Sequence, residues 1–312
     1  MNPEENQKAE FCRLLNDYQA ANERGDVQAM ESLAVQLLSV AASEQARNPS
    51  EDLRLRQEAI ECANAGRWEQ AEAAYWRALA LAEAECNHAM IFKSHSDLSS
   101  LHQIRGMSDR ALQEAKAAVD AARKSNMATL LLVALGDLSR CHLMNGEIAA
   151  AAATAEEAVQ NTPADKMHDV QRARALVMRA RCRVEQRQLS DAQRDLDGAW
   201  KLLSPLAEAS MFSGVQGGLA SWWEVNARIR TESNDPAGAA EALGKAVEFR
   251  RTVSQMPQLD GPHKFFWLAN TLQKYSVALM SAGNPDAAIR AFDESRVIYL
   301  KIGASVPGTS KV

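Results

Sequence analysis

The chain has 312 residues, of which 46% are hydrophobic and 24% charged, a composition that is typical of globular proteins and excludes a wholly disordered chain. Its formal net charge of −5 argues against binding of the whole molecule to nucleic acid or to an anionic membrane, because both require an excess of Lys and Arg. Aromatic residues make up only 5%, and alanine is abundant, which favours close-packed helices over β-sheets.

The N-terminal stretch and the cysteines indicate the cellular compartment. Residues 1–10 are polar and acidic, without the basic and then apolar order of a leader peptide, and the longest apolar run, residues 128–135, is too short to cross a bilayer. The cysteines are odd in number and lack a CxxC pair, which favours reduced thiols over a disulfide framework. We therefore expect a cytoplasmic protein without a membrane anchor. The cysteines are Cys12, Cys62, Cys86, Cys141 and Cys182.

A helical hairpin repeats along the chain. Its clearest copy runs from Leu135 to Pro163, where two amphipathic helices are separated by a turn at Asn145-Gly146. Equivalent turns follow one another at intervals of 41, 40, 40, 41, 47 and 49 residues. This spacing predicts seven hairpins. The turn positions are Gly25, Gly66, Gly106, Gly146, Arg187, Asn234 and Gly283.

Small residues recur at two fixed positions after each turn. Their size allows the two helices of a hairpin, and then the next hairpin, to approach closely. The residues five positions after the turns are Met30, Ala71, Ala111, Ala151, Ala192, Ala239 and Ala288. The residues a further seven positions on are Leu37, Ala78, Ala118, Ala158, Ala199, Ala246 and Ser295.

These features resemble the tetratricopeptide repeat family over roughly residues 10 to 300. The best match is the stretch Gly66–Ala71 followed by Tyr75 and Ala78, which has the glycine, aromatic and alanine residues of the family in order. The period of 40 or more exceeds the usual 34, which indicates longer helices and links. The resemblance implies an all-α, right-handed superhelix of about seven hairpins, a solenoid that binds another molecule in its concave groove.

The spacing also suggests how the chain is organised. We expect repeats 1–5 in residues 1–210, repeats 6 and 7 in residues 211–302, and a disordered tail at residues 303–312. Pro205 and three glycines before Trp222 interrupt the helical pattern, and Pro257, Gly261 and Pro262 form a second loose stretch. Both stretches are either long loops between repeats or points at which the last two repeats tilt against the first five, so we place a soft boundary near Met211.

The histidines invite a metal hypothesis, because His88, His95 and His102 recur every seven residues. The repeat register places His95, His102 and His142 at packing positions of the first helices, and no HExxH or paired-cysteine pattern is present. We therefore expect no metal, no cofactor and no catalytic residues.

Arginine is concentrated between residues 171 and 187. Six arginines there accompany a single acid, Glu185, and at helical spacing they form two stripes. Arg174 and Arg181 share one stripe, and the other holds Arg172, Arg179, Arg183 and Arg187. The family register buries Arg179, Arg183 and the later Arg230, so either they pair with Asp191, Asp195 or Asp197, or this junction is more open than the register implies.

The resemblance further implies that the residue six positions before each turn faces the groove. In three consecutive repeats that residue is arginine, a ladder suited to carboxylates or phosphates. The alternative is that these arginines are simply solvated on exposed helices. The groove positions are Gln19, Ile60, Ser100, Arg140, Arg181, Arg228 and Val277. As candidate partner-binding residues we take Ser100, Gln103, Arg140, Met144, Arg174, Arg181 and Arg228.

The sequence as a whole favours a non-enzymatic interaction scaffold or adaptor. We expect a protein or peptide partner with acidic or extended segments and no membrane partner, and the sequence does not predict the oligomeric state. The first alternative is a regulatory module that senses a ligand or peptide and transmits a change of superhelical pitch. The second is an RNA-binding helical repeat, which the net charge and the scarcity of aromatics disfavour.

Overall fold

The structure, a computed structural model, describes residues 51–207, 213–256 and 261–304, together with residues 10, 13, 14, 16, 17, 20, 21, 24, 29, 32, 33 and 36. The chain divides into two compact units, Met1–Arg54 and Leu55–Val312. In the first unit, every described residue before 51 is helical. The predicted first turn at Gly25, its partner positions Met30 and Leu37, and Cys12 lie outside the described residues.

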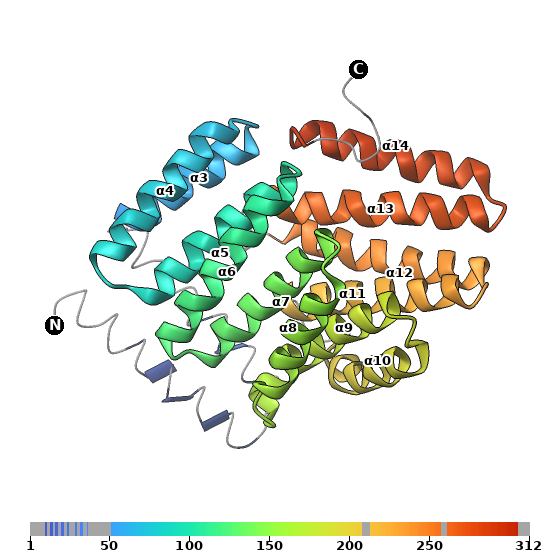
Figure 1. Cartoon of the computed structure of the whole chain (residues 1–312), viewed down its shortest axis with the longest axis horizontal. Coiled ribbons are helices and arrows are strands. Elements are labelled where there is room, and N and C mark those ends of the chain that lie inside the picture. Colours follow the sequence, from blue (N-terminus) through green and yellow to red (C-terminus); the bar gives the residue numbers. More distant parts are fainter. Residues whose placement is uncertain are drawn as a thin grey trace. The chain divides into compact units, whose positions relative to one another are not determined.

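From residue 51 onward, the described part of the chain contains twelve α-helices, two short 3₁₀ turns and no strand. The helices form six consecutive hairpins, which Figure 1 shows in chain order from blue to red. The first helices are α3 (Glu51–Asn64), α5 (His88–Ile104), α7 (Ala128–Met144), α9 (Asp169–Glu185), α11 (Ser213–Glu232) and α13 (His263–Ser281). The second helices are α4 (Trp68–Ala84), α6 (Ser108–Ser125), α8 (Ile148–Gln160), α10 (Leu189–Leu203), α12 (Pro236–Gln255) and α14 (Pro285–Lys301). The 3₁₀ turns are η1 (Lys166–His168) and η2 (Ser204–Leu206).

The predicted hairpin turns share one backbone geometry. Each of the six described turn residues has a positive φ, including Arg187 at 62° and Asn234 at 60°, which replace glycine. Each turn also makes the same two backbone hydrogen bonds, such as Gly66 N–H to Ala63 O at 3.0 Å and Arg67 N–H to Cys62 O at 2.8 Å. These bonds close a helix C-terminus around a left-handed residue. The repeat register predicted from the sequence is therefore confirmed at these turns.

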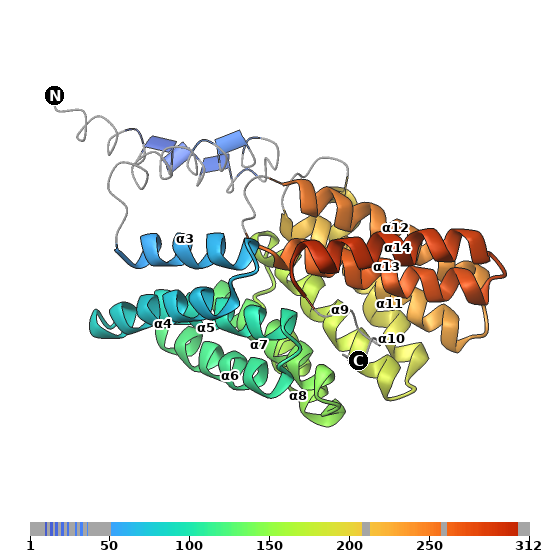
Figure 2. The same cartoon turned by 90° about the horizontal axis from the view of Figure 1, so that it is seen from above.

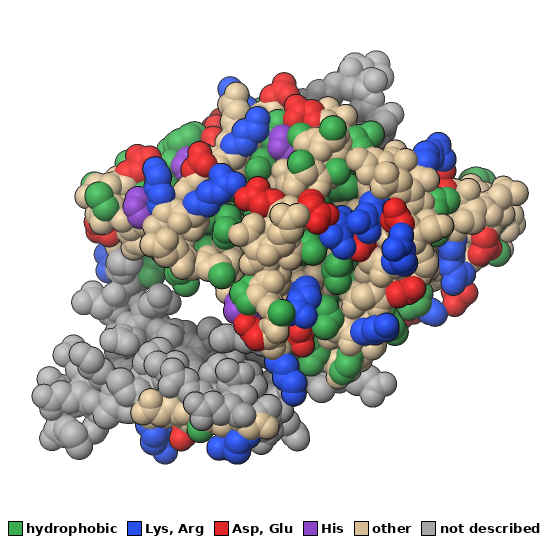
Figure 3. Space-filling model, turned by 60° about the horizontal axis from the view of Figure 1, so that its bottom comes forward, with side chains coloured by type: hydrophobic (Ala, Val, Ile, Leu, Met, Phe, Trp, Pro, Cys, Tyr) green, Lys and Arg blue, Asp and Glu red, His purple; other side chains and the backbone are tan. Residues whose placement is uncertain are grey.

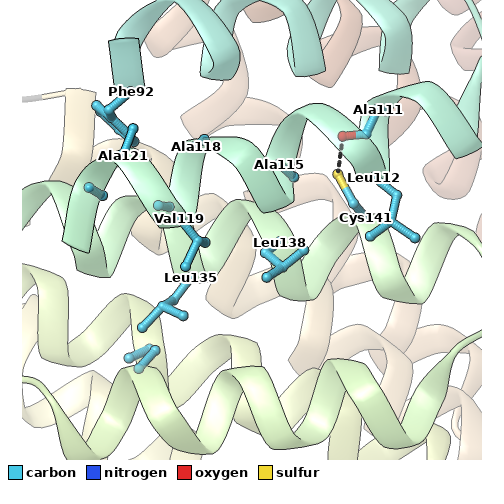
Figure 4. Packing of buried hydrophobic residues seen from close by; sticks show 14 residues of the cluster. Phe92, Ala111, Leu112, Ala115, Ala118, Val119, Ala121, Leu135, Leu138 and Cys141 are labelled. Atoms are coloured by element: carbon cyan, nitrogen blue, oxygen red, sulfur yellow. Dashed lines mark hydrogen bonds between the residues drawn. The ribbon is translucent and has the colours of Figure 1, made fainter. Parts of the chain in front are cut away.

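The predicted small positions form the core of the array. From the second hairpin onward, the residues five and twelve positions after each turn are buried, with Ala71, Ala151 and Ala192 fully inaccessible. Figure 4 shows this packing around Ala111, Ala115 and Ala118, which face Leu135 and Leu138. Serine adds a polar contact at the same repeat position, because Ser99 Oγ donates to Ala111 O and Ser139 Oγ to Ala151 O, at 2.9 and 2.8 Å.

The expected loop before Trp222 is partly helical instead. Helix α11 begins at Ser213, so Gly214, Gly217 and Gly218 belong to its first turns. A Cβ on Gly218 would lie 3.5 Å from the side chain of Leu203, so the glycine permits close packing against the end of α10. The predicted boundary residue Met211 lies outside the described residues, and the soft boundary stays a prediction.

The two ends of the described array contact each other. Tyr299 and Ile302 of the last hairpin pack in one apolar cluster with Ile104 and Phe266, and Trp68 lies against this cluster. Gly303 would place a Cβ 3.4 Å from the Trp68 ring. Figures 1 and 2 show the C-terminal end of α14 beside the α3–α4 hairpin. We call these six residues the end contact.

The end contact changes two expectations. Gly303 and Ala304, placed in the predicted tail, are described, and Ala304 is buried; residues 305–312 lie outside the described residues. The six described hairpins form an all-α, right-handed superhelix as predicted. The register did not predict that the α13–α14 hairpin packs on the α3–α4 and α5–α6 hairpins. None of the described helices is both long and apolar enough to span a membrane.

Candidate binding pocket

A pocket of about 700 Å³ lies among helices α9, α11, α12 and α13. Three successive groove positions predicted from the sequence, Arg181, Arg228 and Val277, line it together. Its other charged residues are Glu185, Glu224 and Lys274, and its apolar lining includes Val184, Val225, Leu243 and Ala278. The pocket therefore combines cationic donors with an apolar wall.

Glu224 is the electrostatic centre of this pocket. Its carboxylate is buried and accepts hydrogen bonds from Arg250 Nη2 at 2.8 Å, Lys274 Nζ at 3.0 Å and Arg181 Nη2 at 3.4 Å. Thr271 Oγ1 also donates to it, at 2.9 Å. These four donors come from three different helices, so one carboxylate ties α9, α12 and α13 to α11. Three positive charges surround one negative charge, which leaves an excess of positive charge at the pocket.

The protonation states follow from this arrangement. Burial would raise the pKa of the Glu224 carboxyl, but Lys274, Arg250 and Arg181 hold it well below its usual value. Burial lowers the pKa of Lys274 and of Arg181, although Glu224 opposes this shift in both. Lys274 is nevertheless about half exposed, as expected for a side chain on the wall of a concave surface. Its ammonium group and the Arg181 guanidinium each have donors left for a ligand.

Arg228 is held at the pocket by acids on two helices. Its guanidinium lies 3.1 Å from Glu232 and 4.0 Å from Glu185, and its side chain is about half exposed. Glu232 also pairs with Arg187, the residue at the left-handed turn between α9 and α10. Arg228 is therefore positioned by flexible surface pairs, whereas Arg181 is fixed by a buried one.

Arg140 occupies a different environment from Arg181 and Arg228. It pairs with Asp137 on its own helix, and its guanidinium carbon lies 4.8 Å from the centroid of the Trp267 ring. Its Nε also donates to Gln103 Oε1 at 3.4 Å. Gln103 departs from our expectation, because it is buried and its amide contacts Ser99 and Cys141. Gln103 thus supports Arg140 from inside the protein.

The remaining candidate residues lie on the first helices outside the pocket lining. Arg174 is exposed and makes no hydrogen bond or ion pair with a described residue. Burial of its guanidinium region nevertheless lowers its pKa, an effect that nearby Arg140 and Arg250 strengthen and Asp137 opposes. Ser100 is half-buried and Met144 is exposed. The predicted ladder is therefore divided between the pocket and the surface near Trp267.

Comparison with known proteins identifies the fold. No protein-family model matches the sequence, and no curated protein matches it. The apo form of RapI has a similar structure, with a TM-score of 0.60 at 11% identity, covering 94% of this chain and 99% of RapI. The fold is that of the tetratricopeptide-type helical repeats.

Two further structures share this tetratricopeptide-type fold. A Rap protein complexed with competence and sporulation factor has a TM-score of 0.58 at 12% identity, covering 92% of this chain and 75% of the Rap chain. BtubC from P. vanneervenii has a TM-score of 0.50 at 18% identity, covering 78% of this chain and 96% of BtubC. At such identities the similarity establishes the fold alone.

Two arginines of the second stripe, Arg179 and Arg183, pair with a buried carboxylate. Arg179 makes a bidentate contact with Asp195, in which Nε and Nη2 lie 2.9 and 2.7 Å from the two carboxylate oxygens. Arg183 Nη1 lies 2.8 Å from the same carboxylate. Asp195 is buried on α10, so it is the pairing partner among the three aspartates considered. Arg230 is more open and lies 3.6 Å from Asp235.

The histidines are held by hydrogen bonds or by packing. His95 Nδ1 lies 2.7 Å from Glu114, and His142 Nδ1 lies 2.6 Å from Glu147. His102 is buried, and burial lowers its pKa. In the part of the chain that the structure describes, no group of three or more His, Cys, Asp and Glu is arranged to hold a metal ion. The absence of a metal stays a prediction.

Four residues that lie in or beside the pocket or beside Arg140 are not predicted from the sequence: Glu224, Arg250, Trp267 and Lys274. Arg250 lies on a second helix, where the repeat register predicts no groove contact. Glu224 did have a detectable signal, because it is a lone acid among the apolar residues of Trp222–Val225. A buried carboxylate of this kind requires cationic partners.

Proposed function

We propose that this chain is a non-enzymatic interaction module that binds a protein or peptide segment through the pocket of Arg181, Arg228 and Lys274. The observation that carries the proposal is that groove positions from three successive hairpins converge on one cavity of about 700 Å³. The excess positive charge around Glu224 favours a segment that contributes a carboxylate. The valines and Leu243 of the pocket wall favour an apolar neighbour beside that carboxylate.

The other candidate residues suit an extension of the same surface. The Arg174 guanidinium makes no hydrogen bond or ion pair with a described residue, and Met144 offers an adaptable apolar side chain. Ser100 and the Gln103–Arg140 pair lie on the neighbouring first helices α5 and α7. An extended acidic segment that crosses these helices would meet a positive charge in each of several hairpins. The Rap protein of the same fold was solved in a complex with competence and sporulation factor, which supports a comparable use of this fold.

A sensing function is the second candidate, and the end contact favours it. Trp68 and Gly303 are in contact although they belong to the first and last of the six described hairpins. A ligand that changes the superhelical pitch would therefore change the distance between these two residues. Small-angle scattering with and without the bound segment would detect this change in dimensions. An RNA-binding function is less well supported, because Figure 3 shows a face on which Lys and Arg are interspersed with Asp and Glu.

The test is a charge reversal at Arg228. A partner is captured from an extract of the native cells, its bound segment is synthesised, and the affinity is measured by fluorescence anisotropy at two salt concentrations. Arg228→Glu should weaken binding by about tenfold or more, because it replaces a donor with a repelling carboxylate. Arg77→Glu on α4 is the matched control, since Arg77 is similarly exposed and lies outside the pocket.

Three outcomes are informative. Equal affinity of the Arg228→Glu and Arg77→Glu variants would refute the pocket as the binding site. Capture of RNA with a steep loss of affinity at higher salt would favour the nucleic-acid function instead. Reversal of Arg181 is not used, because a new carboxylate beside buried Glu224 would disturb the fold.

A further inference from the structure

The terminal helix α14 exposes an apolar face. Ile289, Phe292, Val297 and Leu300 are between 39% and 67% exposed. The opposite face of the same helix is buried, with Ala288 and Ala291 packed against α13 and Tyr299 in the end contact. Large apolar side chains grouped on one exposed face commonly mark an interaction surface. Four large apolar side chains on this face therefore indicate a docking surface.

The exposed residues form an ordered stripe. Ile289, Asp293, Arg296 and Leu300 follow one another at steps of four, three and four residues, so they lie in one row along the helix. Phe292 and Val297 flank this row. An apolar residue therefore stands at each end of the row, with an acid and a base between them. We call this row the α14 stripe.

The α14 stripe is complementary to itself when it is reversed. If two α14 helices lie antiparallel and centred between Glu294 and Ser295, Ile289 faces Leu300 of the partner subunit. Asp293 then faces Arg296 of the partner subunit. Within one chain, Asp293 and Arg296 are only 3.8 Å apart and both more than half exposed, so each has capacity for a second ion pair. In a two-fold symmetric interface, a residue of one subunit faces a second residue of the other subunit, and the same pair occurs again with the subunits interchanged. The α14 stripe has this arrangement.

We propose that α14 is a dimerisation helix, which pairs antiparallel with α14 of a second copy of this chain. The second copy occupies the place where a further hairpin would stack on the array. One helix pair is smaller than the roughly 800 Å² per partner of a standard interface. The dimer is therefore weak and reversible, with the apolar residues supplying affinity and the two charge pairs setting the register.

The test measures the mass of the full chain by analytical ultracentrifugation from about 1 to about 200 µM, a range that brackets a micromolar dissociation constant. The wild type should shift from monomer to dimer across this range. Asp293→Arg and Arg296→Asp should each weaken dimerisation by about tenfold or more, because each places like charges opposite one another twice. The double variant Asp293→Arg/Arg296→Asp should restore it.

A mixture of the two single variants gives the sharpest result. In the mixed dimer, each new arginine at position 293 faces a new aspartate at position 296, while the unchanged residues also form an opposite pair. The mixture should therefore dimerise where neither variant does alone. This pattern depends on the antiparallel register and would not follow from a general change in charge or stability.

An apolar variant completes the test. Leu300→Glu should abolish dimerisation, whereas Met127→Glu, at an exposed apolar residue before α7, should leave it unchanged. A wild type that stays monomeric at every concentration would overturn the proposal, and so would a dimer that survives Leu300→Glu. A monomer in which hydrogen exchange of α14 is protected would assign this face to another segment of the same chain.

Discussion

Helix α9 takes part in two clusters in which several cations share one buried carboxylate, and the two clusters differ in what surrounds them. At Asp195, Arg179 and Arg183 approach from the neighbouring helix of the same hairpin. Arg179 also reaches Glu156, and Arg183 also reaches the carbonyl of Asp191. The positive charges at this junction therefore have several acceptors. Such a cluster stabilises the hairpin and leaves little donor capacity for a ligand.

At Glu224, in contrast, the cations outnumber their acceptors. One carboxylate serves Arg181, Arg250 and Lys274, which come from three other helices. Two of these cations, Arg181 and Lys274, line the pocket. The two clusters therefore differ in donor capacity: the cations around Glu224 outnumber their acceptors beside a cavity, and those around Asp195 do not. Four variants and conditions test this difference.

Glu224→Gln should have the largest effect on stability. It leaves three cations close together without a carboxylate, and breaking a buried ion pair from one side costs about 3–5 kcal/mol. The free energy of unfolding, measured by urea denaturation, should fall by that amount. Adding Lys274→Gln should recover part of the loss, because it removes one of the repelling charges. Independent, additive effects of the two substitutions would contradict the shared cluster.

Asp195→Asn should destabilise the chain less, by about 1–3 kcal/mol, because its arginines retain other acceptors. The same urea experiment measures this difference. Affinity for the segment bound in the pocket should stay unchanged, since Asp195 does not line the cavity. A loss of binding without a larger loss of stability would mean that the two clusters are not separable.

Acid titration should separate wild type from Glu224→Gln. The pKa of Glu224 is lowered in the folded state, so its contribution to stability is present above its unfolded value of 4.5 and is lost as the pH falls toward the folded pKa. The stability difference between the two proteins should therefore be constant above pH 4.5 and should narrow below it. If the difference in free energy of unfolding between the two proteins stayed constant down to the pH of acid unfolding, the lowered pKa of Glu224 would be refuted.

Arg228→Gln should have the smallest effect on stability, within about 0.5 kcal/mol, because surface substitutions rarely exceed this. Its melting temperature should match that of wild type, while its affinity for the bound segment falls. A clear drop in melting temperature would assign Arg228 a structural role like that of Arg179.

The periodic features of the fold could be predicted from the sequence. The turn residues, including Arg187 and Asn234, are predictable from their regular spacing, because the same backbone geometry with the same two hydrogen bonds recurs at each described turn. The buried alanines were found for the same reason, since every hairpin contact has the same size limit. The turn residue and the small buried residues are required within each hairpin separately, so the same pattern recurs in the sequence once for each hairpin.

The features that join distant hairpins could not be predicted in this way. The pocket depends on Glu224 meeting Arg181 and Lys274, which lie one hairpin before and one hairpin after it, and no repeat-by-repeat rule gives that distance. The helical start of α11 is not predictable because clustered glycines are typical of a loop, whereas here Gly218 permits close packing against Leu203. The division of the arginine ladder likewise depends on Trp267, which approaches Arg140 from a distant hairpin.

The end contact also has a consequence for how the chain folds and unfolds. In a linear array each hairpin contacts only its neighbours, so such arrays fray from their free ends and lose cooperativity as they lengthen. Here Gly303 and Ile302 pack near Trp68 and Ile104, which belong to the opposite end of the described array. The α13–α14 and α3–α4 hairpins therefore hold each other in place. The residues of the end contact are about two hundred positions apart in the sequence, so bringing them together costs more conformational entropy than forming a single hairpin. We therefore expect the end contact to form last on folding and the six described hairpins to unfold as one unit.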